Sequence, residues 1–176
     1  MTVMGLIIAG CFFFISRALP LPTLAKQKPH STIFTVYMFF SLIGQFAIHL
    51  ASLVFILNEA KGLNKVALDA EAEFKPNILN SALFLLSSSM QIATFAGNYE
   101  GHPFMQSLTE NKPLFLSIIS GTVFTFLAAS GLLPFMDEFI QLVSFPSFFR
   151  SKLLLVMAVD FVASILWEKL SKALFK

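Results

Sequence analysis

A single carboxylate interrupts the last long apolar stretch of this sequence, LLLVMAVDFVASILW. Asp160 is the only acidic residue deep inside an apolar segment, and a charge at the centre of a bilayer costs at least about 2.5–3.5 kcal/mol on insertion scales. We therefore expect the Asp160 side chain to face protein or water rather than lipid. It has a functional interpretation, as an ion or proton site or a contact with a polar substrate, and a structural one, as a hydrogen bond to a neighbouring helix.

Two further apolar segments carry polar side chains at helical spacing. In the first, polar residues spaced 4, 4 and 3 apart share one helical face: Ser41, Gln45, His49 and Ser52. In the second, polar residues again lie on nearly one face: Asn80, Ser87, Gln91, Thr94 and Asn98. Such stripes most simply hydrogen-bond to each other or to further helices, and a hydrated pathway is the alternative. The candidate intramembrane site residues are therefore Asp160, Gln45, His49, Gln91 and Asn80.

The sequence carries no recognisable catalytic or metal-binding pattern. It has no glycine-rich phosphate loop, no nucleophile elbow and no His and Glu pair at the spacing of zinc proteases. His49 is a single imidazole without a second ligand at metal spacing. We therefore predict no catalytic residue, no bound cofactor and no metal ligand within this chain.

The elements that position these residues follow from the composition. The chain has 176 residues, of which 56% are hydrophobic and only 12% charged, and its mean hydropathy is +0.78. Soluble domains carry roughly 25% charged residues, so this composition predicts a membrane protein whose first partner is the lipid bilayer. The net charge of +2 is too small to indicate a nucleic-acid surface. Cys11 lies in an apolar run and is expected to be a small buried hydrophobe.

Five apolar segments predict an all-α transmembrane bundle, because lipid admits only helices or closed barrels and no alternating strand pattern appears. The predicted spans are 1–16, 33–57, 78–97, 114–135 and 152–167. The first has only sixteen residues before Arg17, below the usual minimum of about 17, and is expected to be part of a longer helix. With five spans, the loops 17–32 and 98–113 and the tail share one side, which holds seven of the twelve basic residues and is predicted to be cytosolic.

The loops between these spans resemble a known family. MGLIIAGCFFFISRALPLPTLAKQKPHSTIF resembles the sixth membrane helix and following loop of type V P-type ATPases of the endoplasmic-reticulum branch. The resemblance continues through VYMFFSLIGQFAIHLASLVF, EFKPNILNS and MQIATFAGNYEGHPFMQSLTENKPL. SKLLLVMAVDFVASILWEKL is similar to the tenth helix, which also carries an aspartate where Asp160 stands.

The resemblance implies an endoplasmic-reticulum, multi-pass part of an ATP-driven machine that dislocates misinserted transmembrane helices, a family also described as transporting cations or manganese. Such a machine uses ATP and magnesium, with transmembrane helices as substrates. Nothing in the 176 residues resembles its DKTGT phosphorylation motif or its nucleotide-binding domain. The resemblance therefore implies that residues 1–176 form the C-terminal membrane domain of such an ATPase and act mainly as a scaffold. The partners of this domain would be the remaining helices and the cytosolic domains of the ATPase.

The resemblance suggests that the chain is a fragment of such an ATPase, and two other classes of protein are the alternatives. One is a standalone membrane protein with an ion or proton path through Asp160, His49 and Gln45. The other is a non-catalytic partner that binds the full ATPase as a decoy or scaffold. A start inside a helix favours the fragment, because a standalone protein is expected to begin with a complete span and a flanking charge.

Overall fold

The computed structural model describes residues 2–26, 28, 32, 34–63, 76–132 and 140–175. Within them the chain forms five helices: α1 Thr2–Ser16, α2 Val36–Lys61, α3 Ile78–Asn98, α4 Lys112–Ser130 and α6 Ser147–Phe175. The same residues contain no strand, only an isolated bridge between Pro20 and Met105. The prediction of an all-α helical bundle is confirmed.

Side-chain caps fix the starts of three helices. Thr35, Asn77 and Asn111 each accept a hydrogen bond from a backbone N–H in the first turn of α2, α3 and α4. These N–H groups have no partner within the helix, so a capping oxygen satisfies them. At the other end of α4, Gly131 adopts φ 63°, a left-handed conformation that glycine reaches without strain.

Three helices, α2, α3 and α4, are long and apolar enough to cross a membrane, and α1 contributes a shorter apolar helix, Met4–Ser16. The last helix, α6, extends beyond the predicted span 152–167 at both ends. That prediction stopped at Glu168, yet Glu, Lys, Leu and Ala are good helix formers, and Lys172 near the C-terminus interacts favourably with the helix dipole. Residues 133–135 of the fourth predicted span lie outside the described part of the chain.

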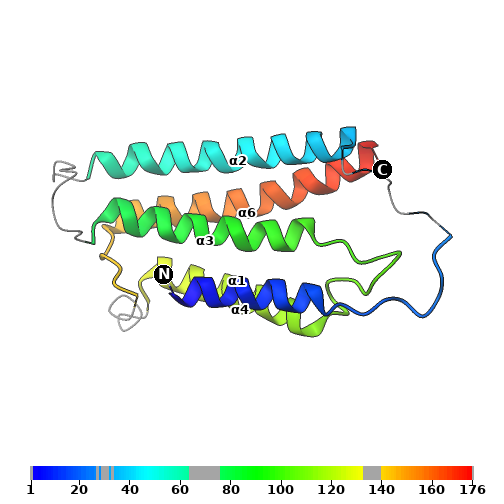
Figure 1. Cartoon of the computed structure of the whole chain (residues 1–176). Coiled ribbons are helices and arrows are strands. Elements are labelled where there is room, and N and C mark those ends of the chain that lie inside the picture. The colour runs from blue at the N-terminus through cyan, green and yellow to red at the C-terminus, as the bar shows by residue number, and fades with distance from the viewer. Residues whose placement is uncertain are drawn as a thin grey trace.

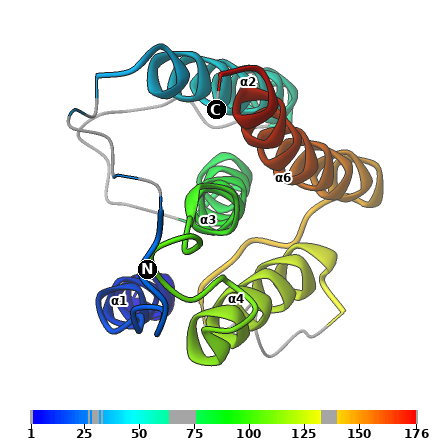
Figure 2. The ribbon, with the colours of Figure 1, turned by 90° about the vertical axis from the view of Figure 1, so that its right-hand side faces the viewer.

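The helices lie side by side with their axes roughly aligned (Figure 1). Seen along the axes, α3 lies near the centre, α2 and α6 pack together on one side of it, and α1 and α4 on the other (Figure 2). One buried apolar cluster joins α2, α3 and α6, including Ile56, Leu86 and Met157. A second joins α1, α3 and α4, including Cys11 and Ile92.

The polar connections gather at one end of the bundle. The segments after α1 and after α3 and the C-terminal end of α6 lie at the same end in Figure 1. The N-terminus and the ends of α2 and α4 lie at the opposite end. These connections are the ones that the basic residues predict to face the cytosol.

Candidate functional site: buried polar groups between α2, α3 and α6

The helices α2 and α6 run antiparallel and approach closely at a glycine. A Cβ added to Gly44 would lie 1.9 Å from Nε1 of Trp167, so the indole occupies the space above this glycine. The Trp167 Nε1–H donates to the carbonyl oxygen of Phe40 at 3.1 Å, and its ring stacks on the Phe40 ring at 4.8 Å. This contact fixes the register in which the polar side chains of the two helices meet.

His49 and Asp160 form a buried pair across this interface. Nδ1 of His49 lies 2.9 Å from Oδ2 and 3.1 Å from Oδ1 of Asp160, and Asp160 is 0% exposed. Counting 1.5 Å per residue, His49 is about 20 Å along the axis from Val36, the first residue of α2, and therefore near the middle of this helix. The structural interpretation of Asp160 requires a hydrogen bond to a neighbouring helix, and α2 supplies it through His49. Nε2 of His49 is also buried and has no hydrogen-bond partner among the described residues.

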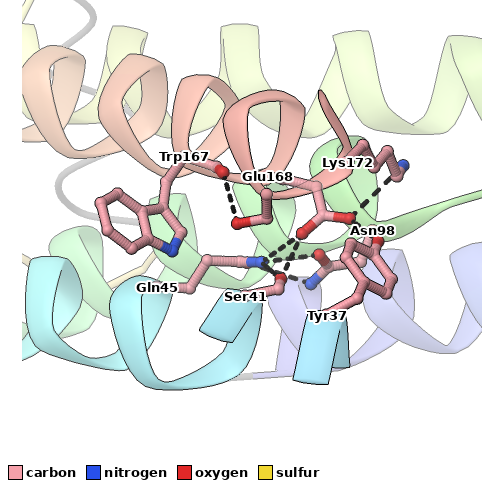
Figure 3. A network of polar contacts seen from close by, with 8 residues as sticks. Tyr37, Ser41, Gln45, Asn98, Trp167, Glu168 and Lys172 are labelled. Carbon is pink, nitrogen blue, oxygen red and sulfur yellow. Dashed lines mark hydrogen bonds and ion pairs between the residues drawn. The ribbon is translucent and has the colours of Figure 1, made fainter. Parts of the chain in front are cut away.

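A larger cluster surrounds Glu168, two helical turns further along α6 (Figure 3). The carboxylate is 3% exposed and accepts hydrogen bonds from the hydroxyls of Tyr37 and Ser41. It also accepts from Gln45 Nε2 at 3.1 Å, and Lys172 Nζ lies 3.4 Å from Oε1. A buried carboxylate needs such partners, because an unpaired charge in this setting is strongly destabilising.

Gln45 extends the cluster to a third helix. Its two amide N–H groups are shared among three acceptors, the Glu168 carboxylate, Ser41 Oγ at 2.8 Å and Asn98 Oδ1 at 2.9 Å. Its amide oxygen accepts from Asn98 Nδ2 at 3.1 Å. Two side-chain amides paired in this way link α2 to the last residue of α3. Hydrogen bonds of this kind hold membrane helices together where apolar contacts give little specificity.

The five candidate residues therefore fall into three places. His49 and Asp160 meet, and Gln45 joins the Glu168 cluster instead of them. Gln91 and Asn80 are exposed on α3 and line cavities beside α1. Among the described residues, neither side chain is hydrogen-bonded to Asp160. The five candidate side chains therefore do not form one continuous pathway.

Of this cluster only Gln45 is among the five candidates; Ser41 and Asn98 belong to the predicted polar stripes, and Glu168, Tyr37 and Lys172 were not predicted. Glu168 was assigned to the tail beyond the last span, and Tyr37 lies at the start of α2. A signal for Glu168 was present in the sequence: the polar residues of α6 repeat the spacing 4, 4 and 3 found in α2, namely Asp160, Ser164, Glu168 and Ser171. All four are at most 3% exposed.

A second polar region is the connection from α3 to α4, which pairs with the segment after α1. Leu21 N donates to Phe104 O at 3.1 Å, and Gln106 N donates to Leu19 O at 3.0 Å. Glu110 accepts a hydrogen bond from Ser107 N at 2.6 Å and lies 2.9 Å from Nε2 of His102. The Ser107 N–H, and next the His102 imidazole, lower the pKa of Glu110 to about 2. The connection is thus an ordered structure.

These arrangements can hold helices and order a connection, but they show no reacting group beside a substrate-sized polar cavity. Within the described part of the chain, no group of three or more His, Cys, Asp or Glu residues could hold a metal ion. The fold and its polar contacts define a polytopic helical membrane domain, or a part of one.

Comparison with known proteins finds relatives along nearly the whole chain. No family model matches the chain. The chain is 42% identical over 99% of its length to the probable manganese-transporting ATPase PDR2 of Arabidopsis thaliana. It is 38% and 37% identical, again over 99% of its length, to the endoplasmic reticulum transmembrane helix translocases of Schizosaccharomyces pombe and Aspergillus fumigatus. It is therefore related along nearly its whole length to one segment of the type V P-type ATPases of the endoplasmic-reticulum branch, as its loops predicted.

The chain spans only about 15% of the length of these relatives. Their names and the three candidate spans also confirm the predicted location, the endoplasmic-reticulum membrane.

Proposed function

We propose that this chain forms the supporting part of the membrane domain of an ATP-driven, endoplasmic-reticulum transmembrane-helix translocase. The observation that carries the proposal is the similarity along 99% of the chain to relatives named for that activity. Its polar contacts support a scaffold role, because the buried carboxylates Asp160 and Glu168 are both paired within the bundle. Groups already satisfied by neighbouring helices stabilise the packing and are poorly placed to bind a passing substrate.

ATP and magnesium belong to the proposed full-length protein and not to these residues. The sequence has no DKTGT motif and no glycine-rich phosphate loop, and the described residues offer no cluster of three carboxylate, imidazole or thiolate ligands. The residues present therefore do not fit a nucleotide or its metal ion. We place ATP hydrolysis in cytosolic domains outside this sequence.

The size of the endogenous polypeptide tests the proposal directly. An antibody against NYEGHPFMQSLTENKP, used on a blot of microsomal membranes, is expected to detect a band far above the 19.5 kDa of this chain. The immunopurified band should hydrolyse ATP, whereas the 176-residue chain alone should not. A single band near 20 kDa without turnover would reject the proposal.

A second candidate function is a proton or cation path through the membrane. The observation that favours it is the His49–Asp160 pair near the middle of α2, a candidate span, since intramembrane ionisable residues commonly mark such paths. It predicts that Asp160→Asn abolishes ion flux through the 176-residue chain in liposomes. Equal flux in the wild type and the variant would eliminate this function.

A further inference from the structure

The faces that α2 and α6 bury within the bundle change character halfway along, and they are called here the α2–α6 seam. On α6 the buried residues are apolar at first and polar afterwards: Phe149, Leu153 and Met157, then Asp160, Ser164, Glu168 and Ser171. On the antiparallel α2 the buried polar residues come first: Ser41 and Gln45, then Ile56 and Ala60. The His49–Asp160 pair therefore lies at the boundary between a polar and an apolar half of the seam.

The polar half of the seam leads to one end of the bundle. From Asp160, buried polar side chains recur at each turn of α6 as far as the turn of Lys172, at the end where the segments after α1 and α3 lie (Figure 1). Toward the opposite end, the polar stripe of α2 stops at the half-buried Ser52, and three side chains at 0% exposure close the seam: Ile56, Leu153 and Met157. Buried water needs polar partners and leaves apolar regions dry, so we expect water to reach the pair from the predicted cytosolic end only.

The charges along the seam are paired at both of its ends. In the apolar half, Lys152 Nζ lies 2.6 Å from Oε2 of Glu59. In the polar half, Lys172 Nζ lies 3.4 Å from Oε1 of Glu168. Lys152 and Glu168 are each eight residues from Asp160 on α6, which is about 12 Å along the axis. Neither pair has a charge left over to balance Asp160.

The neighbouring helices bring no further charge to Asp160 within the part of the chain that the structure describes. On α2, the Tyr37 hydroxyl donates to Glu168 instead. The helix α3 contains no titratable residue, and α4 contains only Lys112, exposed at its first position. The hydrogen-bond and ion-pair partner of the Asp160 carboxylate among these residues is His49 alone. A neutral His49 would thus leave the seam with one uncompensated negative charge.

The His49 imidazole has one nitrogen at which it can take up a proton. Nδ1 lies 2.9 Å and 3.1 Å from the two carboxylate oxygens of Asp160, so it carries the hydrogen that an ionised Asp160 accepts. Nε2 is buried and has no hydrogen-bond partner among the described residues. A proton on Nε2 would convert a buried pair of net charge −1 into an ion pair of net charge zero. That change is favourable, because an uncompensated buried charge is strongly destabilising.

We propose that Nε2 of His49 is a proton-binding site that exchanges with the predicted cytosolic end of the bundle and is closed to the opposite end. The proton is taken from a hydronium ion, which leaves water, and it returns to water on release; no other bond forms or breaks. The site lies wholly within this chain, so it does not depend on the proposed scaffold function. It differs from the second candidate function, which requires access from both ends.

A pH change on one side of a membrane tests the proposal. The chain is labelled with ¹⁵N-histidine in a His30→Gln background, which leaves His49 and His102, and is reconstituted in unequal orientations into liposomes with a buffered interior. His102 is exposed in the connection from α3 to α4, so the fraction of its signal that responds to external pH reports how many chains have that end outside. The same fraction of the His49 Nε2 signal is expected to shift from neutral imidazole to imidazolium as the external pH is lowered.

Each other result of this titration would overturn the proposal. A response of the complementary fraction of the His49 signal would place the access at the opposite end. A response of the whole His49 signal would indicate access from both ends, as the second candidate function requires. No response between about pH 4 and pH 9, on either side of the ordinary histidine range, would mean that the pair binds no exchangeable proton.

Asp160→Asn tests whether the charge of Asp160 holds the proton. The variant keeps an oxygen that accepts from His49 Nδ1, but it removes the negative charge that a proton on Nε2 neutralises. The His49 signal is expected to lose its response to external pH, while the response of His102 in the same sample stays as in the wild type. A His49 response equal to that of the wild type would contradict the proposed site.

A matched pair of substitutions tests the route of the proton. Ser164→Val removes a hydroxyl one turn from Asp160 in the polar half; this hydroxyl donates to Phe161 O at 3.1 Å within α6, so its loss leaves no partner on another helix. Ser52→Val removes the same group from α2 about one turn from His49 on the other side. The exchange rate of the His49 proton, measured from line broadening, is expected to fall in the Ser164→Val chain and to stay unchanged in the Ser52→Val chain. The reverse order, or equal rates in the two variants, would overturn the proposed access.

Discussion

Gly44 is the residue on which the approach of α2 to α6 depends most directly. Because an added Cβ would lie 1.9 Å from Trp167 Nε1, Gly44→Ala must displace the indole or separate the helices. Overpacking of this kind costs about 1–3 kcal/mol, and we expect a lower midpoint in SDS-induced unfolding of the chain. Gly10→Ala is the control, since its added Cβ would meet only Phe14 at 3.9 Å. Equal stability of the two variants would contradict the close contact.

The His49–Asp160 pair makes a prediction about coupled residues. His49→Leu leaves the buried Asp160 carboxylate without its partner and is expected to destabilise the chain by about 3–5 kcal/mol. Asp160→Leu leaves a buried imidazole and should cost less, about 1–3 kcal/mol. The double variant should be more stable than His49→Leu alone, because neither polar group is then stranded. A double-mutant cycle in SDS unfolding measures this coupling, and simple additivity would show that the pair is not a unit.

The lowered pKa of Glu110 predicts how the connection from α3 to α4 responds to pH. Its pKa is lowered to about 2 from 4.5, first by the Ser107 N–H and then by His102. A lowered pKa means that the ordered connection is favoured above pH 4.5 and loses this contribution as the pH falls toward 2. The ¹³C shift of the Glu110 carboxyl should titrate near pH 2, and Ser107→Pro, which removes the donor N–H, should move the midpoint upward. A wild-type midpoint at 4.5 would rule out this hydrogen bond.

At the scale of elements, the start of α4 is tied to the end of α1 by one side chain. Asn111 Oδ1 accepts from Leu114 N at 3.3 Å as the cap of α4, while Nδ2 donates to Phe14 O at 3.0 Å. Asn111→Ala removes both bonds, whereas Asn77→Ala removes only the cap of α3, accepted from Asn80 N at 2.8 Å. A lost cap costs about 1 kcal/mol, so we expect Asn77→Ala near that value and Asn111→Ala to exceed it. Equal losses in thermal unfolding would mean that the link to α1 contributes nothing.

The sequence predicted the elements better than their pairing. Apolar runs and caps such as Asn77 act within a few residues, so the five helices could be placed from local pattern alone. The partner of Asp160 depends on the register between α2 and α6, which the contact of Gly44 with Trp167 sets, residues far apart in sequence. Glu168 was missed because a charge was taken as the end of a span, although α6 continues beyond it with the carboxylate buried.

At the scale of the whole molecule, the bundle has two unequal parts. The helices α2, α3 and α6 share an apolar cluster and the hydrogen bonds centred on Gln45 and Glu168. By contrast, α1 packs mainly on α4 and contacts α3 less. The polar contacts that specify a single register are therefore concentrated in the first part, where a scaffold needs them.

This division predicts an order of local opening. Amide hydrogen exchange of the 176-residue chain in lipid nanodiscs should be slowest in α2, α3 and α6 and faster in α1, because local stability follows buried contacts and shared hydrogen bonds. Protection of α1 equal to that of α2, α3 and α6 would contradict this order.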